Sequence, residues 1–280
     1  AAFRAHALAE AIRRAGRDVR DLGDVEGFRW RPDPRHPKAM NLQAVCRVAE
    51  HVADRVAGAL GGGDMALVLG GDCTVELGSV AGALRESRSV GLIYIDLDTD
   101  LNPPDASDGA LDWTGVAHLL DVEGAAPELS ALGPRRPMLF DSDVLYLGAD
   151  PPAQTAVEKA TMISRALRCI ELADVQRSPE ATLRQAIDWG QRFERVAVHL
   201  DVDVLSFAAF PIAENVRRQD GLTLPELATI LGGLLAAPNV ATLTIAEVNP
   251  DHAPDQAETF AHLIAAIADA LARDQDSSRA

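Results

Sequence analysis

Five apolar runs separated by amphipathic segments constrain the fold of this chain more than any other feature. The runs are ALVLGG (66–71), VGLIYID (90–96), VLYLGAD (144–150), RVAVHLDVDVL (195–205) and VATLTIAEVN (240–249). Helical periodicity lies around them, at 7–15, 41–60, 74–87, 154–167, 180–189, 224–235 and 257–273. Strands that are apolar at every position are covered on both faces, and helices between them connect the strands of a parallel sheet. The pattern predicts an α/β fold with three layers, α/β/α.

We find no internal domain boundary in the sequence. The Pro- and Arg-rich loop 28–38 and the loop 207–221 are too short to separate domains, and 280 residues suffice for one large core. A short extended piece is expected at 18–25, before the first long helix. We therefore expect a single domain over residues 1–280. The sequence opens on a helical segment, so we expect that a first strand of the sheet is absent from this sequence.

Composition and charge exclude several classes of function. The formal net charge is −16 at pH 7, and an acidic protein releases no counterions from nucleic acid or anionic membranes. No apolar run approaches the roughly 20 residues of a membrane-spanning helix, and the first residues lack the apolar core of a signal peptide. The cysteines, Cys46, Cys73 and Cys169, are too few and too scattered for a disulfide framework. We expect a soluble cytoplasmic protein without nucleic-acid or membrane partners.

Acidic residues follow the apolar runs where the predicted strands end. They are Asp72, Asp96, Asp98, Asp100, Asp201, Asp203 and Glu247, joined by Cys73 and Asn249. Ligands of open parallel sheets bind at the carboxyl ends of the strands, so these side chains are expected at one rim. Positions i and i+2 of a strand point the same way, which pairs Asp96 with Asp98. The same spacing pairs Asp201 with Asp203.

Carboxylates that converge at a buried rim require compensation by positive charge. The segments DLDTDLN and LDVDVL contain no Lys or Arg, so metal ions are the economical candidates. A single D-x-D at a strand end is more typical of a turn or a helix cap. Two such motifs on separate buried strands, with an acidic third strand end, favour metal binding. Two neighbouring ions would use five carboxylates better than one ion.

Four motifs in this order, LGGDCT, DLDTDLN, HLDVDVL and AEVNP, resemble those of the arginase/agmatinase ureohydrolase family. The resemblance extends over nearly the whole chain, and four ordered motifs are a specific signal. It implies an α/β/α fold around a mainly parallel sheet of about eight strands, with a binuclear Mn²⁺ centre. The reaction it implies is hydrolysis of a guanidino C–N bond, which releases urea and an amine, in a homo-oligomer (trimer or hexamer).

Carried over by position, the resemblance assigns roles to individual residues. The metal ligands would be Cys73, Asp96, Asp98, Asp100, Asp201 and Asp203, with Asp96 and Asp201 as the bridging carboxylates. Glu247 is the acid that would hold the guanidinium group. Asn102 lies where the loop would reach the polar tail of the substrate.

The histidines of the family's active centre are replaced in this sequence. GGDH is here GGDC and DAHxD is here DLDTD, so Cys73 and Asp98 stand at the two histidine ligand positions. Asp98 has the reach to occupy the ligand position of a histidine, whereas the soft Cys73 thiol is a poor match for manganese. We therefore expect the ion beside Cys73 to be weakly bound. Ser206 and Phe207 stand where DVDxxDP ends in aspartate and proline.

Proton transfer has three candidates in the absence of the family's shuttle histidine. Asp112, in GALDWTG, stands at the position of that histidine, and Asp100 is the candidate for relaying a proton from the water of the site. His118 lies six residues after Asp112 and follows WTGVA at helical spacing. That spacing favours packing or exposure of His118 over catalysis.

Two further side chains beside these motifs have open roles. Trp113 either walls the substrate pocket or packs in the core, with equal support for each. His199 precedes Asp201 by two residues, and we expect it in the core or behind the site.

The function that these observations favour is metal-dependent hydrolysis of a guanidino or amidino group on a small cationic substrate. PPDASDGALDW lacks the amino-acid-binding pattern TxxSGN, so a decarboxylated or modified guanidine is as well supported as arginine. The alternative is a catalytically inactive protein of the same fold, retained for ligand binding or assembly. Hydrolysis of another amide or acyl bond, as in the deacetylases of this broad fold, has the weakest support, because the zinc-binding histidine is also absent.

Overall fold

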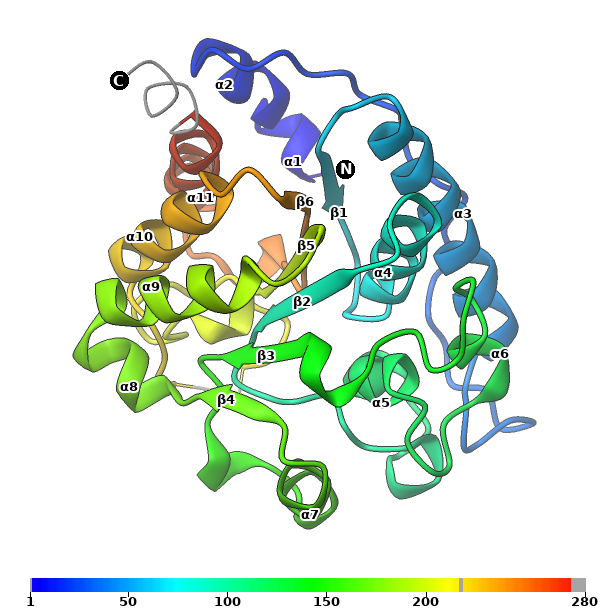
Figure 1. Cartoon of the computed structure of the whole chain (residues 1–280). Helices are drawn as coiled ribbons and strands as arrows, with labels where there is room; N and C mark the ends of the chain where they lie inside the picture. Colours follow the sequence, from blue (N-terminus) through cyan, green and yellow to red (C-terminus); the bar gives the residue numbers. More distant parts are fainter. Residues whose placement is uncertain (1, 217–218, 273–280) are drawn as a thin grey trace.

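The computed structural model describes residues 2–216 and 219–272, and a parallel β-sheet forms its centre (Figure 1). The strands are β1 (Ala66–Leu69), β2 (Val90–Ile95), β3 (Val144–Leu147), β4 (Arg168–Ile170), β5 (Arg195–Asp201) and β6 (Val240–Ala246). They pair in the order β1-β6-β5-β2-β3-β4, and every pair is parallel. The carboxyl ends of all these strands therefore lie along one edge of the sheet.

Helices cover both faces of this sheet. They are α1 (Ala2–Ala5), α2 (Leu8–Arg14), α3 (Leu42–Gly61), α4 (Val75–Glu86), α5 (Gly115–Leu119), α6 (Pro127–Ser130), α7 (Ala156–Ser164), α8 (Leu172–Arg177), α9 (Pro179–Gly190), α10 (Leu224–Leu235) and α11 (Gln256–Ala272). One core joins α1, α2 and α8–α11 to one face, and a second core joins α3–α6 to the other (Figure 1). Alternate residues of β2 divide between the cores, with Ile93 in the first and Tyr94 in the second. The predicted three-layer α/β fold is confirmed.

The sheet is smaller than the sequence implied, because the described residues contain six strands where about eight were expected. The expected extended piece at 18–25 forms no strand. Its acids are engaged with α1 instead: Arg4 pairs with Asp21 at 2.7 Å and with Asp24 at 2.5 Å. Gly23 between them has φ of 77°, outside the range of a strand.

Most predicted helices match observed ones to within a few residues. The prediction at 41–60 corresponds to α3, and the one at 224–235 to α10. α10 begins with a capping box in which the Thr223 side chain and the Glu226 backbone are hydrogen-bonded. The predicted strand at 195–205 ends early, because a 3₁₀ turn (Val202–Val204) follows Asp201. Arg273, the last residue of the predicted helix 257–273, lies outside the described residues.

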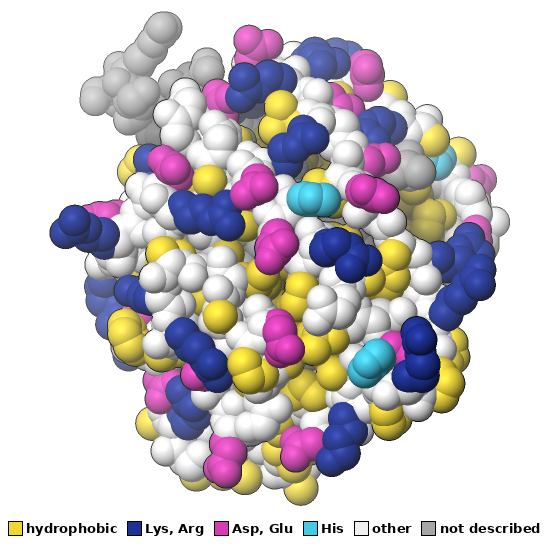
Figure 2. Space-filling view, turned by 90° about the vertical axis from the view of Figure 1, so that its right-hand side faces the viewer, with side chains coloured by type: hydrophobic (Ala, Val, Ile, Leu, Met, Phe, Trp, Pro, Cys, Tyr) yellow, Lys and Arg dark blue, Asp and Glu magenta, His cyan; other side chains and the backbone are white. Residues whose placement is uncertain are grey.

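The helices and one face of the surface show how apolar and charged residues are distributed. Within the described residues, no helix has the length and apolarity to cross a bilayer. On the face shown in Figure 2, basic and acidic side chains are interspersed among apolar and uncharged ones.

Candidate functional site

The strand register brings acids of separate strands to the same level. β2 and β5 pair with Ile95 opposite Leu200, so Asp96 and Asp201, one residue further on, lie side by side at the rim. Tyr94 lies opposite His199 in the same register. Because alternate residues share a face, all four of these side chains belong to the face that α3–α6 cover.

Asp96, Asp201 and Asp203 form the first of two groups with metal-binding geometry. One carboxylate oxygen of each lies within 4.8 Å of the others, and all three residues are buried. Local hydrogen bonds fix two of them: the Asp98 backbone N–H donates to Asp96 Oδ1, and the Asp203 N–H to Asp201 Oδ1, each at 2.7 Å. Asn215 also donates its side-chain N–H to Asp203 Oδ2 at 3.1 Å.

These carboxylates repel one another in a buried setting. Burial, followed by the charges of Asp201 and Asp203, raises the pKa of Asp96 well above its usual value. Burial and the charge of Asp203 do the same to the pKa of Asp201. A divalent cation would remove both causes, because it supplies the missing positive charge and replaces lost hydration.

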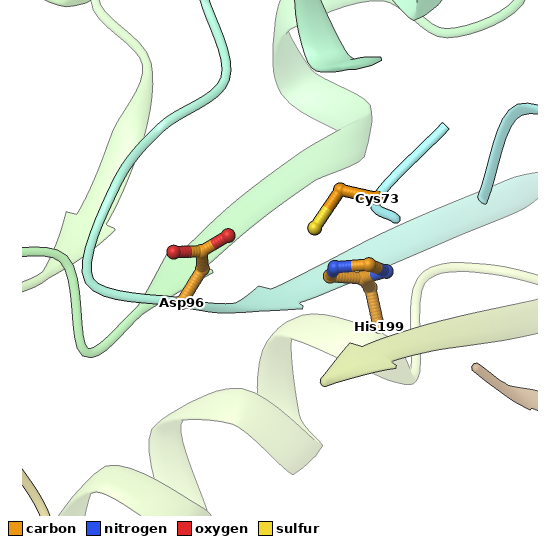
Figure 3. A group of neighbouring side chains, drawn as sticks. All are labelled: Cys73, Asp96 and His199. Carbon is orange, nitrogen blue, oxygen red and sulfur yellow. The ribbon is translucent and has the colours of Figure 1, made fainter. Parts of the chain in front are cut away.

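The second group shares Asp96 but has different chemistry. It consists of Cys73, Asp96 and His199, with one donor atom of each within 4.8 Å of the others (Figure 3). Cys73 follows β1, and its thiol donates a hydrogen bond to Asp201 Oδ2 at 3.1 Å. The thiol therefore already links the second group to the first.

Asp98 and Asp100, both predicted as ligands, lie outside these two groups. Asp100 is buried with φ of 51°, and its Oδ2 accepts a hydrogen bond from the Tyr94 hydroxyl at 2.5 Å. Burial raises the pKa of Asp100, and the Tyr94 hydrogen bond opposes the rise. Asp98 is half-buried beside them. Their role as metal ligands stays a prediction.

Glu247 and Asp112 are two further acidic residues near the rim. Glu247 follows β6 with φ of 61°, and its N–H donates to the Gly71 carbonyl at 2.8 Å. Burial first, then the charges of Asp72 and Asp112, raise the pKa of Glu247 to about 9. Burial and the charge of Asp72 raise the pKa of Asp112 to about 6. These two predicted residues are thus electrostatic neighbours.

Three other predicted residues lie in or against the protein interior. His118, in α5, is fully buried, and its Nδ1 bonds the Thr114 carbonyl at 2.6 Å. Burial lowers its pKa to about 4. Asn102 is fully buried, and its Oδ1 accepts from the Thr155 hydroxyl at 2.8 Å, which ties the loop after β2 to the start of α7. Trp113 is half-buried in the 3₁₀ turn that contains Asp112.

Glu76 is the residue of the site that the sequence interpretation missed. His199 was expected in the core or behind the site, and it is fully buried and stacked on Tyr94. In the structure Glu76 Oε2 lies 3.5 Å from His199 Nδ1, and both side chains are buried. Two signals were present in the sequence: the i, i+2 spacing of His199 and Asp201, and a glutamate in the apolar helix segment after Cys73.

The fold and the rim define an α/β protein with a candidate metal centre at the carboxyl ends of parallel strands. An arginase family model matches residues 3–272. Human arginase-1 is 26% identical over 270 residues, covering 95% of this chain and 83% of its own length. Arginase, non-hepatic 2, of Xenopus laevis is 26% identical over 261 residues, covering 89% of this chain and 70% of its own. The crystal structure of arginase from Bacillus cereus superimposes with a TM-score of 0.87 at 24% identity, over 96% of this chain and 90% of that one.

This chain belongs to the arginase family. The resemblance inferred from four motifs is therefore confirmed at the level of the family.

Proposed function

We propose that this protein is a Mn²⁺-dependent hydrolase that cleaves a guanidino or amidino C–N bond and releases urea and an amine. The observation that carries the proposal is the convergence of buried carboxylates from β2 and β5, with Glu247 at the end of β6. Family membership adds to it. Together they favour a reaction in which cations, both metal and substrate, meet at one acidic rim.

The residues at the rim fit manganese on one side better than on the other. Asp96, Asp201 and Asp203 offer only oxygen donors, which suit a hard divalent ion. Bound there, such an ion supplies Lewis-acid activation of water and of the substrate carbon. The Cys73 side offers sulfur and nitrogen, which match manganese poorly.

Glu247 is the proposed anchor of the substrate cation. A carboxylate pairs with a planar guanidinium through two parallel hydrogen bonds, a geometry that an ammonium group does not reproduce. Because burial and neighbouring acids raise the pKa of Glu247 to about 9, the carboxyl group is protonated at neutral pH without a nearby cation. A guanidinium beside it favours the ionised form. The residue that would bind the remote end of the substrate is not assigned. Asn102, the candidate from the sequence, is buried, and its Oδ1 accepts a hydrogen bond from Thr155.

Asp112 is the proposed proton donor to the leaving amine. Its pKa of about 6 lies near the range in which a carboxyl group exchanges protons at neutral pH. General acid catalysis contributes about 10²–10⁴-fold, so Asp112→Asn is expected to lower kcat by that factor. An unchanged kcat would remove Asp112 from the mechanism. Asp100 is the second candidate, as a relay, with its Oδ2 already held by Tyr94.

The alternative function, ligand binding without turnover, also has a specific observation in its favour. His118, the one histidine predicted for catalysis, is fully buried with Nδ1 bonded to a backbone carbonyl. It lacks the exposure that proton exchange with a substrate requires.

A screen of guanidino compounds for urea release tests the proposal. Purified protein supplied with Mn²⁺ is incubated with arginine, its decarboxylated form and other guanidines, and urea is measured. Glu247→Gln keeps the shape but removes the charge, and we expect KM to rise roughly 10- to 100-fold, the loss of about 1.5–3 kcal/mol. Glu50→Gln, the same change at an exposed glutamate of α3, is the matched control. Saturable binding of one compound without urea from any would favour the alternative.

The proposal extends to the state of the protein in the cell. We propose a single domain over residues 1–280 that assembles as a homo-oligomer, a trimer or hexamer, in the cytoplasm. The resemblance supports the assembly, and the few, scattered cysteines support a reducing compartment. Light scattering of the purified chain measures the assembly directly.

A further inference from the structure

His199 and Glu76 form an isolated polar pair in the interior. Both are essentially without solvent exposure, and Glu76 Oε2 lies 3.5 Å from His199 Nδ1. At that separation neither ring nitrogen of His199 and neither carboxylate oxygen of Glu76 has a hydrogen-bond partner in the described part of the chain. The His199 ring stacks on Tyr94, with centroids 4.2 Å apart and planes 6° apart, so its orientation is fixed.

A pair of this kind is costly unless something else uses it. Buried polar atoms are nearly always hydrogen-bonded, and exceptions call for a specific cause such as an ion or a functional role. A buried ion pair is by itself weak evidence for stability, because removing both groups from water offsets their attraction. The ordinary interpretation, a structural ion pair, leaves the free ring nitrogen unexplained.

The free side of His199 faces two other donors. Figure 3 shows one ring nitrogen on the side of Cys73 and Asp96, and the other on the opposite side. Since Glu76 lies at Nδ1, Nε2 is the nitrogen left for a ligand. One donor atom from each of Cys73, Asp96 and His199 lies within 4.8 Å of the others, a spacing compatible with a single ion between them. The three residues come from different strand ends, so the sheet holds their relative positions.

We propose that Cys73, Asp96 and His199 form a binding site for a Zn²⁺-class ion, with Glu76 as the residue that positions the imidazole. Sulfur, nitrogen and carboxylate oxygen together are the donors of zinc sites, and three protein ligands leave a fourth position open. A carboxylate behind the distal nitrogen of a ligating histidine is the usual means of fixing its tautomer and orientation. Asp96 is then shared with the carboxylate group, which places a soft and a hard site side by side.

Binding at this site has a defined proton balance. The Cys73 thiol keeps its proton and donates a hydrogen bond to Asp201, whereas coordination requires the thiolate, so one proton is released to solvent when the ion binds. His199 would bind through Nε2 as neutral imidazole, which leaves its proton on Nδ1, the nitrogen on the side of Glu76. The inference deepens the proposed function by naming the metal at the same rim, but it requires no turnover.

Cobalt(II) titration of the full chain, after removal of metal by chelator, tests the site. A thiolate ligand gives Co²⁺ an intense near-ultraviolet charge-transfer band, which carboxylates and imidazole alone do not give. We expect the band to saturate at one equivalent, to be displaced by Zn²⁺ and to vanish in Cys73→Ser. Cys46→Ser and Cys169→Ser, changes at the other two cysteines, serve as matched controls and should retain it. Absence of the band, or its persistence in Cys73→Ser, would overturn the proposal.

A second measurement tests whether Glu76 positions the His199 imidazole for metal binding or only stabilises the fold. Glu76→Gln should weaken Zn²⁺ binding by about 10- to 100-fold, the range for loss of a carboxylate behind a ligating histidine. His118→Gln, a change at another fully buried histidine, should leave the affinity unchanged. If Glu76 only forms a structural ion pair, Glu76→Gln changes the melting temperature and not the affinity, which would overturn its assignment.

X-ray absorption of the zinc-loaded, unmodified protein covers the case in which a variant fails to fold. A sulfur scatterer at about 2.3 Å and imidazole scattering are expected, and a shell of oxygen alone would reject the site. The outcomes remain distinguishable from those of the proposed function. A cobalt–thiolate band without urea release rejects the hydrolase and keeps the site. Mn²⁺-dependent urea release without the band rejects only the site.

Discussion

On one side of Asp96 lie two more carboxylates, Asp201 and Asp203, and on the other side lie a thiol and an imidazole, Cys73 and His199. Both sides are buried, and their residues lie on or directly after β1, β2 and β5 of one sheet. The two sides share Asp96 and the same sheet, and they differ in their donor atoms. Under the two proposals above, the sheet sets the position of the ions, and single side chains set which ions bind.

Asp96→Asn is expected to have the largest effect, because Asp96 belongs to both groups. The amide keeps the oxygen that accepts the Asp98 N–H, so the turn after β2 is retained. At a metal concentration 100-fold above Kd, binding stabilises the unmodified protein by about 2.7 kcal/mol. We expect the variant to show almost none of this with either Mn²⁺ or Zn²⁺ in thermal melts. Asp150→Asn, after β3 and outside both groups, is the control; equal metal-induced shifts in both variants would break the comparison.

Asp203→Asn should separate the two sides. Asp203 belongs only to the carboxylate group, so Mn²⁺ stabilisation of about 2.7 kcal/mol at 100-fold excess should be lost while Zn²⁺ stabilisation persists. Cys73→Ser should give the converse pattern. Parallel melts of the two variants with each ion measure this directly. If both variants lose both ions to the same extent, the rim acts as one site and the distinction between its sides is wrong.

Cys73→His should make the side of the rim beside residue 73 bind manganese better. The substitution exchanges a soft thiol for a neutral nitrogen donor that manganese accepts, so Mn²⁺ occupancy should rise toward two ions per chain while the cobalt–thiolate band disappears. Metal analysis after dialysis gives the stoichiometry. The sequence alone already predicted weak manganese binding beside Cys73. Tight binding of two Mn²⁺ ions by the unmodified protein, weakened by Cys73→His, would contradict that prediction.

The two sides also differ in how much of them the sequence predicted. Apolar runs and the D-x-D spacings predicted the layers and the meeting of Asp96 with Asp201, since parallel strands bring their ends to one edge. The pairing of Glu76 with His199 was not predictable, because it depends on the register of β2 with β5 and on how α4 packs against the sheet. The strand count differs from the expectation at residues 18–25, which form no strand and place Asp21 and Asp24 beside Arg4. Such tertiary contacts leave no periodic signal.

The two fully buried histidines offer the last test. His118 bonds a backbone carbonyl through Nδ1, whereas His199 has the open nitrogen proposed as a ligand. Burial lowers the pKa of His118 from 6.5 to about 4, so the unfolded chain binds a proton in this interval that the native state does not. This histidine therefore contributes no pH dependence above pH 6.5 and destabilises the fold increasingly as pH falls toward 4, by up to about 3 kcal/mol.

Comparing denaturant unfolding of His118→Gln and the unmodified protein at pH 7 and pH 4.5 isolates this effect from the titration of the carboxylates, which both share. The glutamine variant should lose less stability between the two pH values, because it has no imidazole to protonate on unfolding. Zn²⁺ affinity at pH 7 should be the same in both proteins, since His118 lies outside both donor groups. If the variant instead loses Zn²⁺ and keeps the full pH dependence, His118 would take the role assigned here to His199, and the soft side of the rim would have to be rebuilt around α5.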